Sequence, residues 1–218
     1  MSTGRARVSW SAFADRSQAA AHAAAVIAAR LAEDLSSQDR VSIVVSGGSS
    51  PVECLGLLAR EPIDWARVDV ILSDEREVRE DHELSNARMV REAFLNQGAE
   101  AAVLHSLTEP SLVALPQPFS AVLLGMGTDG HFASVFPDMN DLDAALALDE
   151  PRDLMSVVTA ASPVARVTQT LSRLLRTQQI LLLVFGEEKR AVLDAPAGKP
   201  IAALLEQTQT SVALIWAP

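Results

Sequence analysis

Several residue types are scarce in this chain of 218 residues, and each shortage excludes a class of protein. Cys54 is the single cysteine, so no intramolecular disulfide can form, which fits a reducing cytoplasm. No apolar run approaches the roughly 20 residues that a membrane span needs. An Ala-rich stretch near the N-terminus is interrupted and flanked by charged residues, which indicates a soluble amphipathic helix rather than a signal peptide. We therefore expect a cytoplasmic protein that does not associate with membranes.

Positive charge is also scarce. The net charge is −10 at pH 7, and lysine occurs only as Lys189 and Lys199. Such a surface repels nucleic acid and anionic lipid on average, so we expect neither as a partner. An anionic small substrate would also be repelled unless local positive groups receive it. Basic residues beside glycine-rich loops are therefore candidate ligands.

Short apolar runs, most of them continuous rather than alternating, recur along the chain. Continuous runs are typical of strands buried on both faces of a parallel sheet. The expected strands cover residues 41–45, 68–72, 121–124, 154–158, 180–185 and 211–216. The expected helices cover residues 17–35, 51–60, 85–95, 167–176, 187–194 and 200–207. This alternation predicts a single α/β domain over residues 1–218, with a mostly parallel, doubly wound sheet and helices on both faces. Three prolines predict irregular structure over residues 96–118.

In doubly wound folds, ligands bind beyond the carboxyl ends of the strands. The first expected strand is followed by "SGGSSP", residues 46–51. This segment can form a phosphate-binding site at the start of a helix. The donors would be the backbone N–H groups of Gly47 and Gly48 and the hydroxyls of Ser46 and Ser49. An ordinary tight turn is the alternative. No Gly-Lys-Ser/Thr follows, which argues against a nucleoside triphosphate.

Charged residues follow other expected strands. In "SDERE", Arg76 can pair with a phosphate through its planar fork, while Asp74 or Glu75 can hold a sugar hydroxyl or orient Arg76. Arg166 and Lys189 each stand at the start of an expected helix. Solvated surface residues are the alternative in each case. The sharper hypothesis is one phosphate site that collects the three cations.

The third expected strand is followed by "GMGTDGH", residues 125–131. Its glycines, among them Gly127 and Gly130, let the chain turn sharply and approach a ligand closely. The G-x-G-x-x-G pattern does not indicate a dinucleotide site, because the short "FASVFP" replaces the long helix that such a site needs. Neutral His131 is a competent base near pH 7. Asp129 can polarise it, hold the loop or bind substrate, and a structural histidine is the alternative.

Several catalytic arrangements are missing from the sequence. The four histidines are scattered and Cys54 has no partner, so we expect no metal site. A serine nucleophile elbow, G-x-S-x-G, is absent. The chemistry that remains is histidine-assisted hydrolysis or proton transfer on a phosphorylated small molecule, without a cofactor.

Four blocks of the sequence together resemble the 6-phosphogluconolactonases. They are "VSGGSSP", "SDEREVREDHELSNARMV", "LLGMGTDGHFASVFP" and "ARVTQTL…LLLVFGEEKRAVL". The resemblance implies the fold shared with glucosamine-6-phosphate deaminases and related isomerases. It also implies a metal-independent cytosolic enzyme of the oxidative pentose phosphate pathway, acting on a sugar-phosphate lactone. We expect a monomer or a small homo-oligomer.

The resemblance also implies a role for each candidate residue. His131 takes a proton from the water that attacks the lactone carbonyl, and Asp129 supports His131 or the substrate. The implied substrate and phosphate ligands are Ser46, Gly47, Gly48, Ser49, Asp74, Glu75, Arg76, Gly127, Gly130, Arg166 and Lys189. The sequence leaves open which of Asp74, Glu75 and Asp129 supports the histidine.

Two other functions are compatible with the same fold. The deaminases usually carry D-E-Y where this chain has Asp74, Glu75 and Arg76, and their supporting glutamate falls on Phe136. That substitution favours lactone hydrolysis over deamination. Sugar-phosphate-sensing domains of transcription regulators bind without catalysis, but the acidic charge and the Ala-rich helix before Val41 speak against DNA binding.

Overall fold

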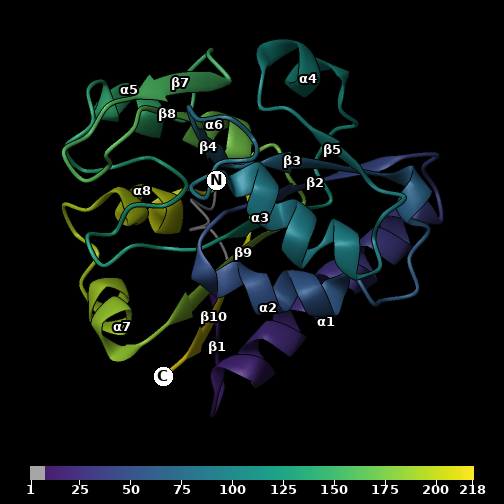
Figure 1. Cartoon of the computed structure of the whole chain (residues 1–218). Coiled ribbons are helices and arrows are strands. Elements are labelled where there is room, and N and C mark those ends of the chain that lie inside the picture. Colours follow the sequence, from purple (N-terminus) through teal and green to yellow (C-terminus); the bar gives the residue numbers. More distant parts are fainter. Residues whose placement is uncertain (1–7) are drawn as a thin grey trace, which may run out of the picture.

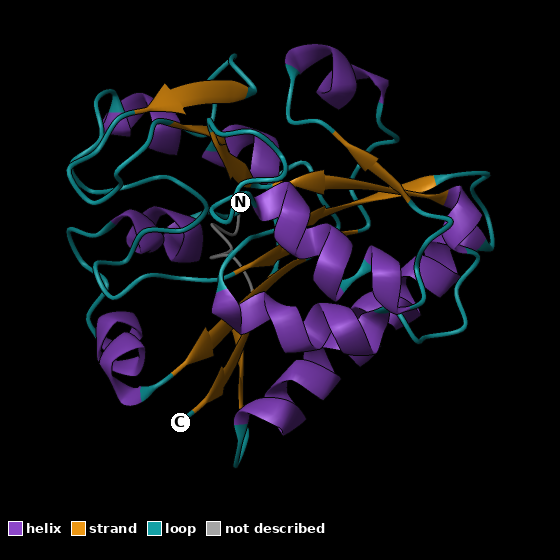
Figure 2. Ribbon diagram, in the orientation of Figure 1, coloured by secondary structure: helices purple, strands orange, loops and turns teal. Residues whose placement is uncertain are grey.

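A computed structural model describes residues 8–218. Its main sheet has seven parallel strands, and helices cover both faces of that sheet (Figures 1 and 2). The strand order is β1-β10-β9-β6-β2-β3-β5. In that order the strands cover Val8–Ala12, Val212–Ala217, Ile180–Phe185, Ala121–Leu124, Val41–Val45, Val68–Leu72 and Val103–His105. Apolar residues fill the central strands because both faces of the sheet are covered. The predicted doubly wound α/β fold is confirmed. The predicted domain also includes residues 1–7, which lie outside the described residues.

Two hydrophobic clusters flank the sheet. One joins the sheet to α1 (Arg16–Leu35), α2 (Ser49–Leu58) and α3 (Asn86–Ala93). The other lies on the opposite face, with α4 (Glu109–Ala114), α5 (Leu142–Leu146), α6 (Leu171–Leu174), α7 (Glu187–Asp194) and α8 (Pro200–Glu206). Two short 3-10 helices, η1 and η2, cover Trp65–Arg67 and Leu95–Gln97. None of the helices within residues 8–218 combines the length and the apolar content that crossing a bilayer requires.

A second, three-stranded antiparallel sheet was not predicted. It has the order β4-β8-β7, with β4 at Asp74–Arg76, β8 at Arg166–Gln169 and β7 at Leu154–Val157. The run at 154–158 is therefore a strand, but it lies outside the parallel sheet. The helix expected over 167–176 is wrong for residues 167–169, which belong to β8 instead. Val167 and Thr168 are β-branched and suit a strand, and Thr170 then caps the short helix α6 by accepting from Arg173 N.

The N-terminal edge and residues 96–118 also differ from expectation. Strand β1 lies at the edge of the sheet and is largely exposed, so it lacks the continuous apolar run that marks the central strands. The 96–118 segment contains β5 and α4 rather than irregular structure alone. Pro110 is compatible with α4 because it occupies the first turn, where its missing N–H has no intrahelical partner to lose.

Asp69 links the start of β3 to its neighbours. Its buried carboxylate accepts two hydrogen bonds from Arg40, at 2.8 and 3.0 Å, and lies 2.8 Å from Nε2 of His105. Burial alone would raise the pKa of Asp69, but the hydrogen bonds from Arg40 and His105 outweigh it and hold this pKa below its usual value. The cluster therefore ties the edge strand β5 to the segment that precedes β2.

Candidate active site

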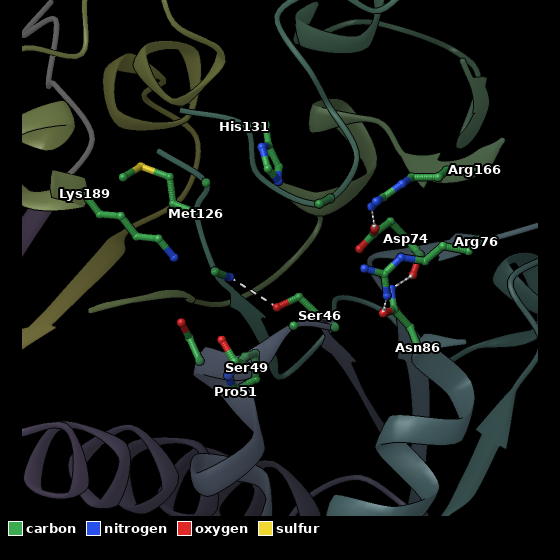
Figure 3. Close-up of a pocket in the computed structure, with 16 residues that line it drawn as sticks. Ser46, Ser49, Pro51, Asp74, Arg76, Asn86, Met126, His131, Arg166 and Lys189 are labelled. Carbon is green, nitrogen blue, oxygen red and sulfur yellow. Dashed lines mark hydrogen bonds and ion pairs between the residues drawn. The ribbon is translucent and has the colours of Figure 1, made fainter. Parts of the chain in front are cut away.

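The loops after β2, β3, β6 and β9 meet at the carboxyl edge of the parallel sheet and enclose a cavity of about 230 Å³, the scale of a small metabolite (Figure 3). Ten residues predicted from the sequence line it: Ser46, Gly47, Gly48, Ser49, Asp74, Arg76, Gly127, His131, Arg166 and Lys189. In Figure 3, His131, Lys189 and Arg166 enter the cavity from different sides, and Ser46 and Ser49 lie across from His131. The topology thus brings together segments that are far apart in the sequence.

The β2–α2 loop forms the part of the wall that suits an anion. Ser46 Oγ accepts a hydrogen bond of 3.2 Å from the Gly125 N–H, which fixes this loop against the loop after β6. The ten-residue helix α2 begins at Ser49, and no side chain of the described residues caps its N-terminus. Its first N–H groups therefore remain as donors at the cavity, where the helix dipole also favours negative charge.

His131 is held by Asp129. Nδ1 of His131 lies 2.6 Å from Oδ1 of Asp129, and the same oxygen accepts the His131 backbone N–H at 3.1 Å. A neutral imidazole beside a carboxylate donates from Nδ1, which leaves Nε2 as the acceptor. Gly127 leaves room for this pair, because a Cβ there would lie 2.3 Å from Nδ1. Asp129 itself does not line the cavity.

Phe136 covers the imidazole from one side. The ring centroids of His131 and Phe136 are 4.2 Å apart, with an interplanar angle of 31°. The Arg166 guanidinium lies 5.1 Å from the centroid of the same phenyl ring, within the range of a cation–π contact. Phe136 is 3% exposed and belongs to the hydrophobic core, so the His131 imidazole packs against the edge of that core.

Asp74 joins the histidine loop to the three-stranded sheet. Its carboxylate accepts hydrogen bonds from Ser73 Oγ at 2.8 Å and from Ser134 Oγ at 2.5 Å. Nη1 of Arg166 lies 3.8 Å from Oδ2 of Asp74 and 3.3 Å from Ser134 Oγ. Because Ser134 lies only three residues after His131, this network fixes the imidazole relative to Arg166.

Glu75 and Gly130 do not line the cavity, although both are candidate ligands in the sequence. The Glu75 carboxylate accepts the backbone N–H groups of Asn86 and Ala87 at 2.8 and 2.7 Å, and thus caps α3. The carbonyl of Gly130 accepts from Ile201 N at 2.9 Å, which turns it toward α8. Of the three carboxylates left open by the sequence, Asp129 is the one in contact with His131.

Three cations, Arg76, Arg166 and Lys189, reach the cavity, and all three are partly buried. Burial lowers the pKa of Arg166, and the neighbouring Arg76 lowers it further. Burial likewise lowers the pKa of Lys189, with a smaller contribution from Arg16. Positive groups that have lost water and repel one another gain most from a bound anion. The local charge therefore opposes the net charge of the whole chain.

Comparison with known proteins identifies the family to which the chain belongs. Residues 14–215 match the family described as glucosamine-6-phosphate isomerases/6-phosphogluconolactonase. The chain belongs to this family. A 6-phosphogluconolactonase of Mesorhizobium japonicum is 35% identical over an alignment of 230 positions, which covers 98% of this chain and 97% of that protein. One of Pseudomonas aeruginosa is 38% identical over 185 residues, covering 79% and 78%. The crystal structure of a 6-phosphogluconolactonase from Shewanella baltica has a TM-score of 0.91 and 33% identity, covering 99% of this chain and all of that one.

Six further residues of this member of the isomerase/lactonase family line the cavity: Ser50, Pro51, Asn86, Gly125, Met126 and Ala133. Ser50, Pro51, Gly125 and Met126 lie in the two loops that the sequence marked as ligand-binding, whereas Asn86 and Ala133 were not expected at the site. Asn86 directly follows Ser85, which caps α3 by accepting a hydrogen bond of 3.1 Å from Arg88 N. Ala133 has φ +47°, a left-handed conformation that is unusual for a residue with a side chain, and no sequence pattern marks it. Within residues 8–218, no group of three His, Cys, Asp or Glu side chains is placed to hold a metal ion.

Proposed function

We propose that this chain hydrolyses 6-phospho-D-glucono-1,5-lactone to 6-phospho-D-gluconate, a step of the oxidative pentose phosphate pathway. Relatives at 34–38% identity are 6-phosphogluconolactonases, and they support this reaction. The observation that carries the proposal is the His131–Asp129 pair beside a small cavity that three cations also reach. That combination suits an anionic substrate and a reaction that begins with removal of a proton.

In the proposed mechanism His131 acts as the general base. Nε2 takes a proton from a water molecule, and the water oxygen forms a bond to C1 of the lactone. Negative charge develops on the carbonyl oxygen, where N–H groups of the glycine-rich loops can stabilise it. The bond from C1 to the ring oxygen then breaks, and the proton held by His131 passes to that oxygen. Asp129 orients the imidazole and stabilises the imidazolium that forms between the two proton transfers.

The cations and the β2–α2 loop hold the rest of the substrate in this proposal. Arg76, Arg166 and Lys189 receive the phosphate and the sugar, together with the first N–H groups of α2. These contacts bring the carbonyl to His131, and much of the rate enhancement of an enzyme comes from such positioning. They also overcome the repulsion between an anionic substrate and a chain of net charge −10.

Deamination of glucosamine 6-phosphate is less well supported. The position where the deaminases have a supporting glutamate is Phe136, whose ring lies against the His131 imidazole. A phenyl ring cannot accept or hold a proton, so ring opening of an amino sugar would lack that group. We further infer that the protein acts in the cytoplasm as a monomer or a small homo-oligomer, with no nucleic acid as a partner.

The proposed activity can be tested with two substrates. The lactone is supplied at mildly acidic pH, where its spontaneous opening is slow, and the product is detected with 6-phosphogluconate dehydrogenase. Glucosamine 6-phosphate is supplied in parallel, and released ammonia is measured. We expect lactone hydrolysis above background and no ammonia. Ammonia without lactonase activity would identify a deaminase, and neither product would identify a binding domain.

A further inference from the structure

The side chain of Asn86 lines the cavity and is 1% exposed, but neither the resemblance nor the proposed mechanism gives it a role. Its amide makes two contacts with the segment that follows β3. Oδ1 accepts a hydrogen bond from Nη1 of Arg76, and Nδ2 donates to the carbonyl of Asp74 at 2.8 Å. The amide therefore connects the cavity arginine to the backbone beside it (Figure 3).

The backbone of Asn86 is held just as closely. Glu75 accepts its N–H at 2.8 Å and that of Ala87 at 2.7 Å. Glu75 and Arg76 are consecutive residues of β4, so the strand that carries the arginine also anchors the start of α3. The relative position of Asn86 and Arg76 is thus fixed at both the backbone and the side chain.

A third segment leaves space for this amide. A Cβ on Gly47 would lie 1.8 Å from Oδ1 of Asn86 and 2.2 Å from its Cγ. The φ of Gly47 is not in the left-handed region, so the close approach of Asn86, and not the backbone conformation, requires glycine here. The phosphate-binding loop of the proposed site therefore packs directly on Asn86.

The Arg76 guanidinium has an N–H group that is not hydrogen-bonded within the described residues. This group is the Nε–H, which is buried. A buried donor without a partner is costly, and a bound anion would supply the acceptor that the protein does not. An arginine fork binds an anion well only when its plane is correctly oriented, and here Asn86 holds one of its terminal nitrogens.

We propose that Asn86 is a positioning residue, which orients the Arg76 guanidinium to bind the anionic group of the substrate. The inference rests on the proposed function only for the identity of that substrate. It predicts that Asn86 contributes to binding through Arg76 and has no independent effect. The two residues then form a coupled pair, whereas a residue needed only for stability would act independently of Arg76.

The test is a double-mutant cycle with Asn86→Ala, Arg76→Ala and the double variant. The readouts are KM for the lactone and calorimetric binding of 6-phosphogluconate. Loss of a hydrogen bond to a charged group predicts that Asn86→Ala weakens binding by about ten- to a hundredfold, with a smaller change in kcat. We expect the double variant to bind no more weakly than Arg76→Ala alone. Effects that multiply in the double variant would overturn the proposal. Asn96→Ala, at an exposed asparagine of η2, is the matched control and leaves binding unchanged.

Gly47→Ala disturbs the same contact without altering either partner of the cycle. We expect it to lower the thermal midpoint because of the clash, and Asn86→Ala added to it restores part of the loss. A double variant that melts no higher than Gly47→Ala would contradict the packing on which the proposal depends. If wild-type protein binds 6-phosphogluconate but does not open the lactone, the proposed function fails while the binding cycle still decides the role of Asn86. Wild-type protein that does not bind 6-phosphogluconate would overturn both.

Discussion

Gly127→Ala is the substitution whose effect on catalysis follows most directly from the geometry. The added Cβ would lie 2.3 Å from both Nδ1 and Cε1 of His131, and 2.6 Å from Oδ1 of Asp129. Non-bonded carbon atoms pack at about 3.5–4.0 Å, so the imidazole must move by roughly 1 Å or more. The methyl group also clashes with both partners of the 2.6 Å hydrogen bond between His131 and Asp129. The substitution therefore displaces the base and its support together.

A displacement of that size is large for a catalytic group. A misplacement of about 1 Å can reduce a rate about a hundredfold, so we expect kcat to fall by that order. Overpacking adds a stability cost of about 1–3 kcal/mol, which leaves the protein folded in the assay. The measurement is steady-state lactone hydrolysis, with a urea unfolding curve for each variant.

Gly56→Ala provides a matched control. A Cβ at this helical position meets only the Ala93 carbonyl oxygen, at 3.5 Å, which is ordinary van der Waals contact. We expect unchanged kcat and a gain in stability of about 0.5–1 kcal/mol, since alanine is the better helix former. If Gly127→Ala retained the kcat of the wild type, the placement of His131 and Asp129 beside Gly127 would be refuted.

Three further substitutions test separate parts of the structure. Asp69→Asn removes a carboxylate whose pKa is depressed in the folded state. Its stabilising effect is present above the unfolded pKa of about 3.9 and is lost as the pH falls through the folded value. We therefore expect urea unfolding to show a loss of about 1–3 kcal/mol at pH 7 and a shallower decline below pH 4; equal stability at pH 7 would contradict this. Asp129→Asn removes the charge beside the imidazolium, and because Asp129 is 37% exposed we expect only about a 5- to 30-fold fall in kcat, corresponding to about 1–2 kcal/mol. An unchanged kcat would mean that Asp129 does not support His131. Arg166→Ala raises KM more than it lowers kcat if this cation binds the phosphate equally throughout the reaction, and an unchanged KM would remove it from the site.

The central sheet could be predicted from the sequence because its strands are buried on both faces. Continuous apolar runs marked β2, β3, β6, β9 and β10, and parallel strands place their following loops at one edge. From that rule the sequence predicted that the candidate residues lie close together, and most of them do line one cavity. The edge strand β1 escaped prediction because an exposed strand need not be apolar.

Features set by contacts between distant segments could not be predicted. Strand β8 pairs with β4 and β7. Its sequence is short and mixes polar with apolar residues, so without those partners it predicts the start of a helix. The role of Glu75 depends on where α3 begins in space, and the role of Asn86 depends on Arg76 and Gly47 together. In the sequence alone, Glu75 and Asn86 look like ordinary polar residues of a loop and a helix start. Their contacts with distant segments become visible only in the tertiary fold.

The most direct test of the account compares the wild-type protein with His131→Ala on 6-phosphogluconolactone. Both are assayed at mildly acidic pH, with the spontaneous opening subtracted and the fold checked by circular dichroism. The account predicts clear hydrolysis by the wild type and a rate near background for the folded variant. A folded variant with near-normal turnover would contradict the assignment of His131 as the base.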